Sequence, residues 1–263
     1  INILFISDNF PPEFNAPASR TFDHCKVWAK KGVNITVITC FPNFPKGKIF
    51  PGYKNRLFSV EKMNGIRVIR VWTYIAENSG FIKRTLDYLS FCISAIIVSV
   101  IIKTDIIIAT SPHFFTALSG LIISKLKRKK WILEVRDLWP DSIVELGVIK
   151  NKKIITFLEK LEMMCYRSCD KIISVTNSFK QIIVSRGINS NKIEVIKNGV
   201  DIKLFYPKQK NKDLIEILGL NDKFVLGYIG TIGMAHALDF IVNSAASIDD
   251  KKIHILIMGE GAE

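Results

Sequence analysis

Short apolar runs alternate along this chain with longer segments in which apolar residues recur at helical spacing. The runs are rich in β-branched residues, which suits strands buried on both faces of a parallel sheet. They predict strands at residues 2–7, 34–39, 105–110, 131–135, 171–175, 192–196, 224–229 and 253–258. The segments between them predict helices at residues 16–31, 83–102, 114–127, 152–168, 177–185, 214–218 and 237–246. This alternation is typical of α/β proteins with a doubly wound parallel sheet.

One pair of strands departs from the alternation. Residues 57–61 and 66–72 predict a hairpin, because Asn64-Gly65 between them is a favoured two-residue turn. Further along, a polar and lysine-rich stretch at 208–212 is typical of a linker between domains. We therefore expect two Rossmann-like domains, the first over residues 1–206 and a second, incomplete one over residues 207–263.

The chain is strongly basic, with a formal net charge of +13 and a pI near 9.5. Such a balance favours anionic partners, and three classes compete: nucleic acid, an anionic membrane surface and a phosphorylated substrate. A lysine-rich solvated surface explains the same charge without a partner. We expect no nucleic acid, because no motif with interleaved aromatic residues accompanies the lysines. The densest cluster, residues 125–130, falls at a predicted helix end, where cations complement the helix dipole.

The most apolar segment of the chain is the run at residues 89–102. It is too short for a transmembrane helix, which needs about 20 residues. Two interpretations remain open. The segment is either a helix buried against the sheet, or an interfacial helix that dips into lipid with Trp72, Tyr74 and Phe81 nearby.

Five cysteines lie within the predicted helices and strands, at positions 25, 40, 92, 165 and 169. Cys165 and Cys169 share a helix face, but no histidine or second cysteine pair accompanies them at metal-ligand spacing. We therefore expect buried free thiols and no bound metal. An odd cysteine count without a signal peptide fits a reducing cytoplasm.

Polar residues follow two predicted strands, at the edge of a parallel sheet where ligands bind. Arg136 and Asp137 follow the strand at 131–135, and Ser111-Pro112-His113 follow the strand at 105–110. For the first two, a structural ion pair is the alternative to a functional role. For the second group, the alternative is helix capping by Ser111 beside an incidental His113.

Two strand-to-helix junctions carry small residues that permit close approach of a ligand. Ser19 and Arg20 open one helix, and the planar guanidinium of Arg20 suits phosphate. Gly230 and Gly233 follow the strand at 224–229, where backbone N–H groups can approach a diphosphate. A plain helix start and an ordinary tight turn are the structural alternatives. Neither junction completes the G-x-G-x-x-G fingerprint, which disfavours a dehydrogenase.

Five blocks in this order resemble the GT-B glycosyltransferases of family 4, a large retaining family. The blocks are SDNFPPE at 7–13 with APASR at 16–20; EVRDLWPDS at 134–142; VTNS at 175–178 with RGI at 186–188 and NGVD at 198–201; GYIGTIG at 227–233; and IMGEG at 257–261. The second block resembles the branch of the family that builds bacterial surface polysaccharides. Such enzymes have an acceptor-side first domain and a nucleotide-sugar-binding second domain.

The resemblance implies roles for the residues of the first domain. Asp137 is expected to orient an acceptor hydroxyl or act as its base, and His113 to hydrogen-bond the transferred sugar. Arg136 is expected to bind an acceptor phosphate, and Trp139 to form a platform for a sugar ring or lipid phosphate.

The resemblance also implies contacts with phosphates of the donor. The loop that carries Ser19 and Arg20 is expected to face the donor phosphates or the acceptor. Gly230, Gly233 and His236 are expected to lie near the donor diphosphate. Helix N-termini and basic side chains hold that diphosphate in the family, so neither a metal nor another cofactor is implied beyond the donor itself.

The function that the resemblance implies is retaining hexosyl transfer from a nucleotide-diphosphate sugar to a lipid-linked acceptor, in O-antigen or capsular polysaccharide synthesis. The enzyme is expected in the cytoplasm, peripherally bound to the inner face of the membrane. The alternative is a noncatalytic α/β module that binds a membrane or a partner chain. No two glutamates here have the family's spacing of seven intervening residues. We therefore expect a fragment with a complete first half that is inactive or severely impaired by itself, because leaving-group stabilisation is usually the largest catalytic contribution.

Overall fold

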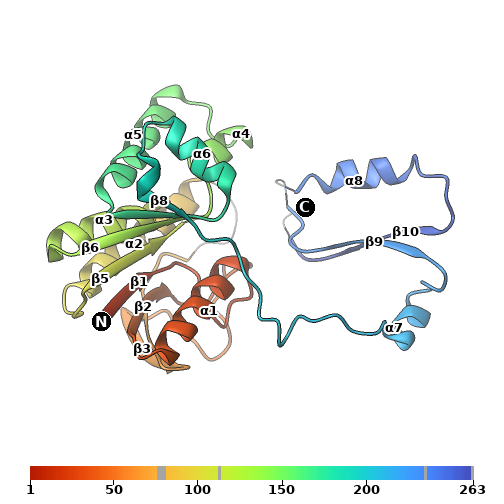
Figure 1. Cartoon of the computed structure of the whole chain (residues 1–263), viewed down its shortest axis with the longest axis horizontal. Coiled ribbons are helices and arrows are strands. Elements are labelled where there is room, and N and C mark those ends of the chain that lie inside the picture. Colours follow the sequence, from red (N-terminus) through yellow and green to blue (C-terminus); the bar gives the residue numbers. More distant parts are fainter. Residues whose placement is uncertain (76–80, 112–113, 234–235, 262–263) are drawn as a thin grey trace. The chain divides into compact units, whose positions relative to one another are not determined.

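The computed structural model describes residues 1–75, 81–111, 114–233 and 236–261, which form two compact units (Figure 1). Unit 1 covers Ile1–Gly199 and unit 2 covers Val200–Glu263. The division therefore falls a few residues before the boundary expected at 206.

Unit 1 is built on one eight-stranded sheet in the order β3-β4-β2-β1-β5-β6-β7-β8. Its strands are β1 Asn2–Ile6, β2 Asn34–Cys40, β3 Phe58–Met63, β4 Ile66–Val71, β5 Ile106–Thr110, β6 Lys130–Val135, β7 Lys171–Ser174 and β8 Ile193–Val195. All neighbouring strands are parallel except β3 and β4, which are antiparallel. The predicted α/β fold class with a mostly parallel sheet is confirmed.

The predicted hairpin is present at one edge of this sheet. Its turn residues Asn64 and Gly65 have φ angles of 50° and 84°. A two-residue turn of this kind needs positive φ at both positions, which asparagine and glycine tolerate best. β4 also pairs in parallel with β2, so the hairpin extends the main sheet.

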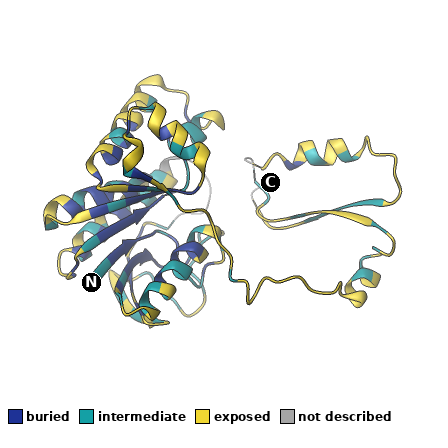
Figure 2. Ribbon diagram, viewed as in Figure 1, coloured by how far each residue is buried: buried dark blue, intermediate teal, exposed yellow. Residues whose placement is uncertain are grey.

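Helices cover both faces of the sheet. One face carries α1 (Ala16–Lys30), whose Cys25 packs with Phe5 of β1 and Val37 of β2. The other face carries the remaining long helices: α2 Phe81–Ser99, α3 Phe114–Lys127, α5 Lys152–Ser168 and α6 Asn177–Ser185. Leu4 and Ile6, the neighbours of Phe5 in β1, belong to the core of that second face. The alternation along the strand thus supplies both cores (Figure 2).

Local sequence explains where several helices begin and end. The Asn15 side chain accepts from Ala18 N at 2.8 Å and caps α1. The Thr176 hydroxyl accepts from Phe179 N at 3.0 Å and caps α6 in the same way. Just beyond α6, Gly187 adopts φ 89°, a conformation that glycine enters without steric cost. Two short elements were not predicted, the helix α4 (Asp141–Glu145) and the 3₁₀ turn η1 (Ser190–Lys192).

Unit 2 contains α7 Lys212–Ile217, β9 Phe224–Ile229, α8 Leu238–Ala245 and β10 Ile253–Met258. β9 and β10 are parallel neighbours, so this is one β-α-β crossover, in the order that the sequence predicts. β9 is largely exposed, with Phe224 65% and Ile229 77% accessible, and β10 is mostly half-buried. Figure 2 shows the same contrast with the buried strands of unit 1.

All five cysteines are free and buried, as predicted. Among the described residues, no helix has both the length and the apolar character that crossing a bilayer requires.

Candidate active site

The carboxyl ends of β1 and β5 meet where the strand order of unit 1 changes direction. From β1 the chain moves outward through β2 and β4, and from β5 it moves the other way through β6, β7 and β8. In open α/β sheets ligands bind outside the strand ends at this switch point. The polar residues after β1, β5 and β6 are therefore placed where a binding site is expected.

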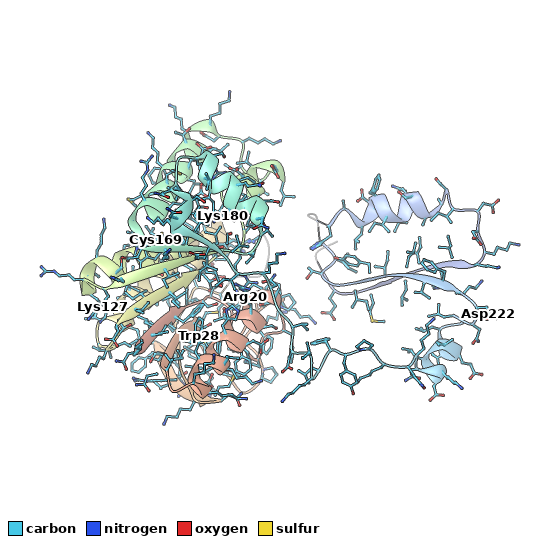
Figure 3. The ribbon with its side chains drawn as sticks, in the orientation of Figure 1. Arg20, Trp28, Lys127, Cys169, Lys180 and Asp222 are labelled. Atoms are coloured by element: carbon cyan, nitrogen blue, oxygen red, sulfur yellow. The ribbon has the colours of Figure 1, made fainter. Side chains whose placement is uncertain are left out.

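A buried ion pair crosses this edge of the sheet. Arg20 lies in the first turns of α1 (Figure 3). Its guanidinium pairs with Glu134 of β6, with Nε to Oε1 at 3.0 Å and Nη2 to Oε1 at 2.9 Å. Thr110, the last residue of β5, donates from its hydroxyl to Glu134 Oε2 at 2.7 Å. Both carboxylate oxygens of Glu134 are therefore hydrogen-bonded. The pair connects α1, β5 and β6 beneath the switch point.

The same guanidinium holds the segment that follows β8. It donates to Ile196 O at 3.0 Å, Lys197 O at 3.0 Å and Asn198 Oδ1 at 3.1 Å. Protein oxygens thus occupy all three nitrogens of Arg20. The predicted phosphate contact of Arg20 stays a prediction, and the contacts seen here position the chain at the end of unit 1. Ser19 beside it is exposed in the first turn of α1.

Arg136 lies two residues beyond Glu134, at the carboxyl end of β6. Its Nε and Nη1 atoms are buried, and among the described residues neither has a hydrogen-bond partner. Burial lowers the pKa of this guanidinium, and the nearby Arg20 charge lowers it further, against the opposing effect of Glu134. An arginine stays charged at neutral pH. The Arg136 guanidinium therefore lies within electrostatic reach of both members of the Arg20–Glu134 pair.

Asp137 follows Arg136 in a tight backbone turn. The Ser111 hydroxyl accepts from Arg136 N at 2.7 Å and from Asp137 N at 3.3 Å, which ties the loop after β6 to the end of β5. Ser142 donates its hydroxyl to Asp137 Oδ2 at 3.1 Å. The structure thus brings Asp137 and Ser111 together. His113, the second predicted catalytic residue, lies outside the described residues.

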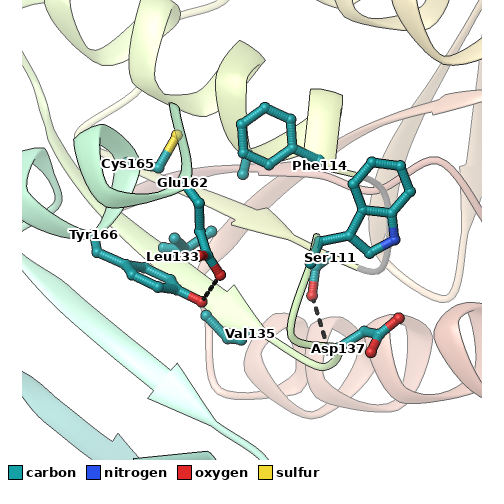
Figure 4. A pocket seen from close by; sticks show the side chains of 10 residues that line it. Ser111, Phe114, Leu133, Val135, Asp137, Glu162, Cys165 and Tyr166 are labelled. Atoms are coloured by element: carbon teal, nitrogen blue, oxygen red, sulfur yellow. Dashed lines mark hydrogen bonds between the residues drawn. The ribbon is translucent and has the colours of Figure 1, made fainter. Parts of the chain in front are cut away.

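A small cavity of about 20 Å³ lies behind Asp137, with room for roughly one water molecule. Figure 4 shows its lining, which comes from α3, β6, α5 and the segments that follow β5 and β6. Trp139 stands at this cavity and stacks on Phe114, with ring centroids 6.4 Å apart and an interplanar angle of 9°. Its predicted role as a platform for a sugar or lipid phosphate stays a prediction, but the stacking holds the indole in one orientation.

A second buried polar network, which the sequence analysis missed, supports the Asp137 loop. Glu162 of α5 accepts from the Tyr166 hydroxyl at 2.6 Å and from Arg186 Nη1 at 2.5 Å. Arg186 also pairs with Asp141 at the start of α4. Burial raises the pKa of Glu162 to about 7. The available signal was a glutamate on the apolar face of α5, one turn after the buried Leu158.

His24 is the other residue near this edge that the sequence analysis missed. It is half-buried on α1, one turn after Arg20. Burial lowers its pKa, the Arg20 charge lowers it further, and the Glu134 charge opposes both. The four-residue spacing from Arg20 places the two on one helix face and was the signal available.

The predicted donor-binding residues belong to unit 2. Gly230 and Gly233 lie in the loop after β9, and His236 N donates to Gly233 O at 2.8 Å. The His236 ring packs edge-on against Tyr228, with centroids 6.1 Å apart. The helix that follows begins only at Leu238, so Gly233 does not itself open it. The three residues are grouped at the carboxyl end of β9, and their contact with a diphosphate stays a prediction.

Over the described residues, no cluster of three or more His, Cys, Asp or Glu side chains has the arrangement that would hold a metal ion.

Comparison with solved structures identifies the fold. Sucrose-phosphate synthase from Thermosynechococcus elongatus superimposes with a TM-score of 0.70 at 15% identity, over 98% of this chain and 62% of that protein. HepE from Anabaena, in complex with UDP-glucose, superimposes with a TM-score of 0.64 at 16% identity, over 98% of this chain and 60% of HepE. At such identities the likeness shows the fold alone.

Sequence comparison identifies the family. The probable glycosyltransferase WbjE of Pseudomonas aeruginosa is 23% identical over 135 residues, which cover 51% of this chain and 34% of WbjE. In each comparison the chain spans less than two thirds of the protein that it matches. The family model for Glycosyltransferase Family 4 matches residues 18–204, from α1 to the segment beyond β8. The chain therefore belongs to Glycosyltransferase Family 4 and has the GT-B fold.

Proposed function

We propose that this protein is a retaining hexosyltransferase that moves a sugar from a nucleotide-diphosphate sugar to a lipid-linked acceptor in O-antigen or capsular polysaccharide synthesis. Family membership supports glycosyl transfer. The binding of UDP-glucose by HepE, which shares the fold, supports a nucleotide sugar as the donor. We place the enzyme in the cytoplasm, peripherally attached to the inner face of the membrane.

One observation carries the proposal: the two unpartnered buried nitrogens of Arg136, beside the Arg20–Glu134 pair. Buried polar nitrogens without hydrogen-bond partners are costly, so we infer that an anion completes them. A phosphate group offers several acceptor oxygens, and a guanidinium binds two of them in parallel. A lipid-linked phosphate or diphosphate therefore fits this edge of the first sheet.

The remaining residues take roles consistent with this placement. Asp137 orients the acceptor hydroxyl or removes its proton, with Trp139 as the platform beside it. Ser19 and Arg20 stand at the phosphate side, and His113 meets the transferred sugar. Gly230, Gly233 and His236 of unit 2 receive the donor diphosphate, whose departure needs charge stabilisation.

Replacing Arg136 by glutamine tests the anion site. We expect the binding of a short prenyl diphosphate, measured by isothermal titration calorimetry, to weaken tenfold or more, because charge-assisted hydrogen bonds each contribute about 1.5–3 kcal/mol. The free energy of unfolding should change little, because Nε and Nη1 have no hydrogen bond within the described residues to lose. The matched control is Arg128→Gln, which changes an exposed arginine. Unchanged binding by Arg136→Gln would contradict the proposed anion site.

The activity itself is tested in the host cell. A strain without the gene should lose or shorten a surface polysaccharide, and a copy of the gene that carries Arg136→Gln should fail to restore it. The alternative function, a noncatalytic membrane-binding module, is favoured by the exposed apolar side of α2. Full restoration by variants of both Arg136 and Asp137, with vesicle binding intact, would support that alternative.

A further inference from the structure

The outer side of α2 is apolar from Leu86 to the end of the helix. From residue 86 to residue 101, every exposed side chain is aliphatic. These residues are Leu86, Leu89, Ile93 and Ile97 in the helix, and Val100 and Ile101 in the turn that follows. We call them the α2 stripe. Ile97 is 65% and Ile101 85% accessible.

The α2 stripe is unusual because α2 already buries a second apolar side. Phe91, Cys92 and Ala95 pack into the core on the inner side of the helix. A surface helix normally turns charged and polar residues outward, and a helix that is apolar all round lies in a core or in lipid. A helix side that only faces water would not be expected to expose six aliphatic side chains along one stripe.

A segment with two aromatic residues lies against α2, within the span of the stripe. Trp72 and Tyr74, both partly exposed, follow β4. The backbone N–H of Tyr74 donates to Ser90 Oγ of α2 at 2.7 Å, which fixes this segment against the helix. Tryptophan and tyrosine favour the level of the lipid headgroups, because their rings are apolar and their tips polar.

Basic residues border the stripe at both ends. Lys127 is the last residue of α3 (Figure 3). It donates from Nζ to Ser99 O at 3.1 Å and to Val100 O at 3.0 Å. This contact places the basic end of α3 beside the end of α2. The cluster comprises Lys103, Lys125, Arg128, Lys129 and Lys130, all exposed. Lys83 and Arg84, also exposed, stand at the start of α2.

Few carboxylates accompany the α2 stripe. Asp87 is the one carboxylate of α2, and it is partly buried. Burial and the charge of Asp8 raise its pKa to about 8. The side therefore combines an aliphatic stripe with positive charge at both ends and little negative charge.

We propose that the α2 stripe docks on an anionic lipid bilayer, with α2 lying in the plane of the interface. The choice of a membrane as partner rests on the proposed function, whose acceptor is lipid-linked. Charge complementarity selects this occupant, because anionic headgroups match the flanking lysines while the aliphatic side chains enter the acyl boundary. A second copy of the chain would instead bring two basic clusters of the same sign together.

Vesicle cosedimentation of the whole chain tests the proposal without any nucleotide sugar, so it can fail or succeed independently of catalysis. Vesicles of phosphatidylcholine mixed with phosphatidylglycerol are compared with vesicles of phosphatidylcholine alone. We expect strong binding to the mixed vesicles, lowered by added salt, and weak binding to the neutral ones. The double variant Ile93→Gln/Ile97→Gln should bind the mixed vesicles at least tenfold more weakly. Lys125→Gln/Lys129→Gln should lower binding by about fivefold for each lysine.

The matched control is Ile154→Gln/Phe157→Gln, which removes two exposed apolar side chains from α5. It should leave vesicle binding unchanged, and circular dichroism should show all variants folded. Equal loss in the control, or no loss in Ile93→Gln/Ile97→Gln, would overturn the proposal. A dimer seen by light scattering would also overturn the proposal, if Ile93→Gln/Ile97→Gln converts it to a monomer while vesicle binding persists.

Discussion

Arg20 and Glu134 are 114 positions apart in the chain, yet their side chains form an ion pair that is only 4% and 3% accessible. The pair joins the start of α1 to the end of β6. Through the other hydrogen bonds of Arg20, it also holds the segment after β8. Several features of the candidate site therefore depend on one buried contact.

Removal of one partner of this pair should destabilise unit 1 strongly. Arg20→Ala leaves the Glu134 carboxylate buried without its cation, which typically costs about 3–5 kcal/mol. Urea unfolding followed by circular dichroism measures the change. The control is Lys171→Ala, which breaks the exposed Lys171–Glu194 pair and should cost about 1 kcal/mol or less. A similar loss in the two variants would show that the burial of Arg20 contributes nothing.

Glu13 should make the stability of unit 1 depend on pH. Burial raises the pKa of this carboxyl from 4.5 to about 7, and the charge of Asp8 adds to the effect, although Asn43 N and Phe44 N donate to Oε1 at 2.8 and 2.9 Å. The folded chain therefore keeps a proton that the unfolded chain loses. The stability that the protonated Glu13 contributes is complete below pH 4.5, and it is lost as the pH rises through about 7.

Glu13→Gln should remove this contribution, because the amide oxygen still accepts both backbone N–H groups and carries no charge. Relative to the natural chain, the variant should gain stability between pH 5 and pH 8, on the order of 3 kcal/mol. Urea midpoints at the two pH values measure the gain. Glu159→Gln, at an exposed position of α5, is the control and should show no such gain. If Glu13→Gln and the natural chain have the same urea midpoints at both pH values, the raised pKa of Glu13 is refuted.

Gly120 should tolerate no larger residue, because α3 approaches the sheet closely there. A Cβ atom at this position would lie 2.6 Å from Ala109 Cβ and 3.2 Å from the Trp131 ring. Gly120→Ala should therefore lower the free energy of unfolding by about 1–3 kcal/mol through overpacking. Gly199→Ala is the control, because nothing lies within 4 Å of a Cβ there. Thermal unfolding of both variants gives the comparison, and a stable Gly120→Ala chain would contradict the close approach.

Unit 2 should open more readily than unit 1. Its sheet has only two strands, and both sides of β9 are largely exposed. An isolated two-stranded sheet is marginally stable in water, and local opening is easiest where few apolar contacts are buried. Native-state hydrogen exchange should show faster exchange for β9 and β10 amides than for β1 and β5. Equal protection in the two units would mean that unit 2 is stabilised by contacts other than its own packing.

The elements of unit 1 could be predicted from sequence because their signals are local. The apolar runs gave β1, β2, β5, β6 and β7, and the turn Asn64-Gly65 gave the hairpin, since positive φ depends on those residues alone. The short helix α4 was missed because five residues carry too little periodicity. Glu162 was missed for a different reason: its partner Arg186 lies just beyond the end of another helix, α6, and no local pattern connects them.

For the candidate site, the sequence predicted where the residues lie but not which partners their side chains have. Arg136, Asp137 and Ser111 were predicted at the strand ends, and they do meet there. Arg20 was expected to contact a phosphate, which stays a prediction, and the structure adds protein oxygens on all three of its nitrogens. The unpartnered nitrogens of Arg136 could not be foreseen, because they result from how neighbouring strands bury that side chain.

The sequence by itself determined the alternation of strands and helices, the hairpin turn and the family, because backbone preference and the spacing of apolar residues act over a few neighbouring positions. The tertiary structure decided which charges are paired, which are left over, and which apolar side of α2 faces outward. Those properties depend on desolvation and on partners more than a hundred residues apart, such as Arg20 and Glu134, which only the order of strands in the sheet brings together.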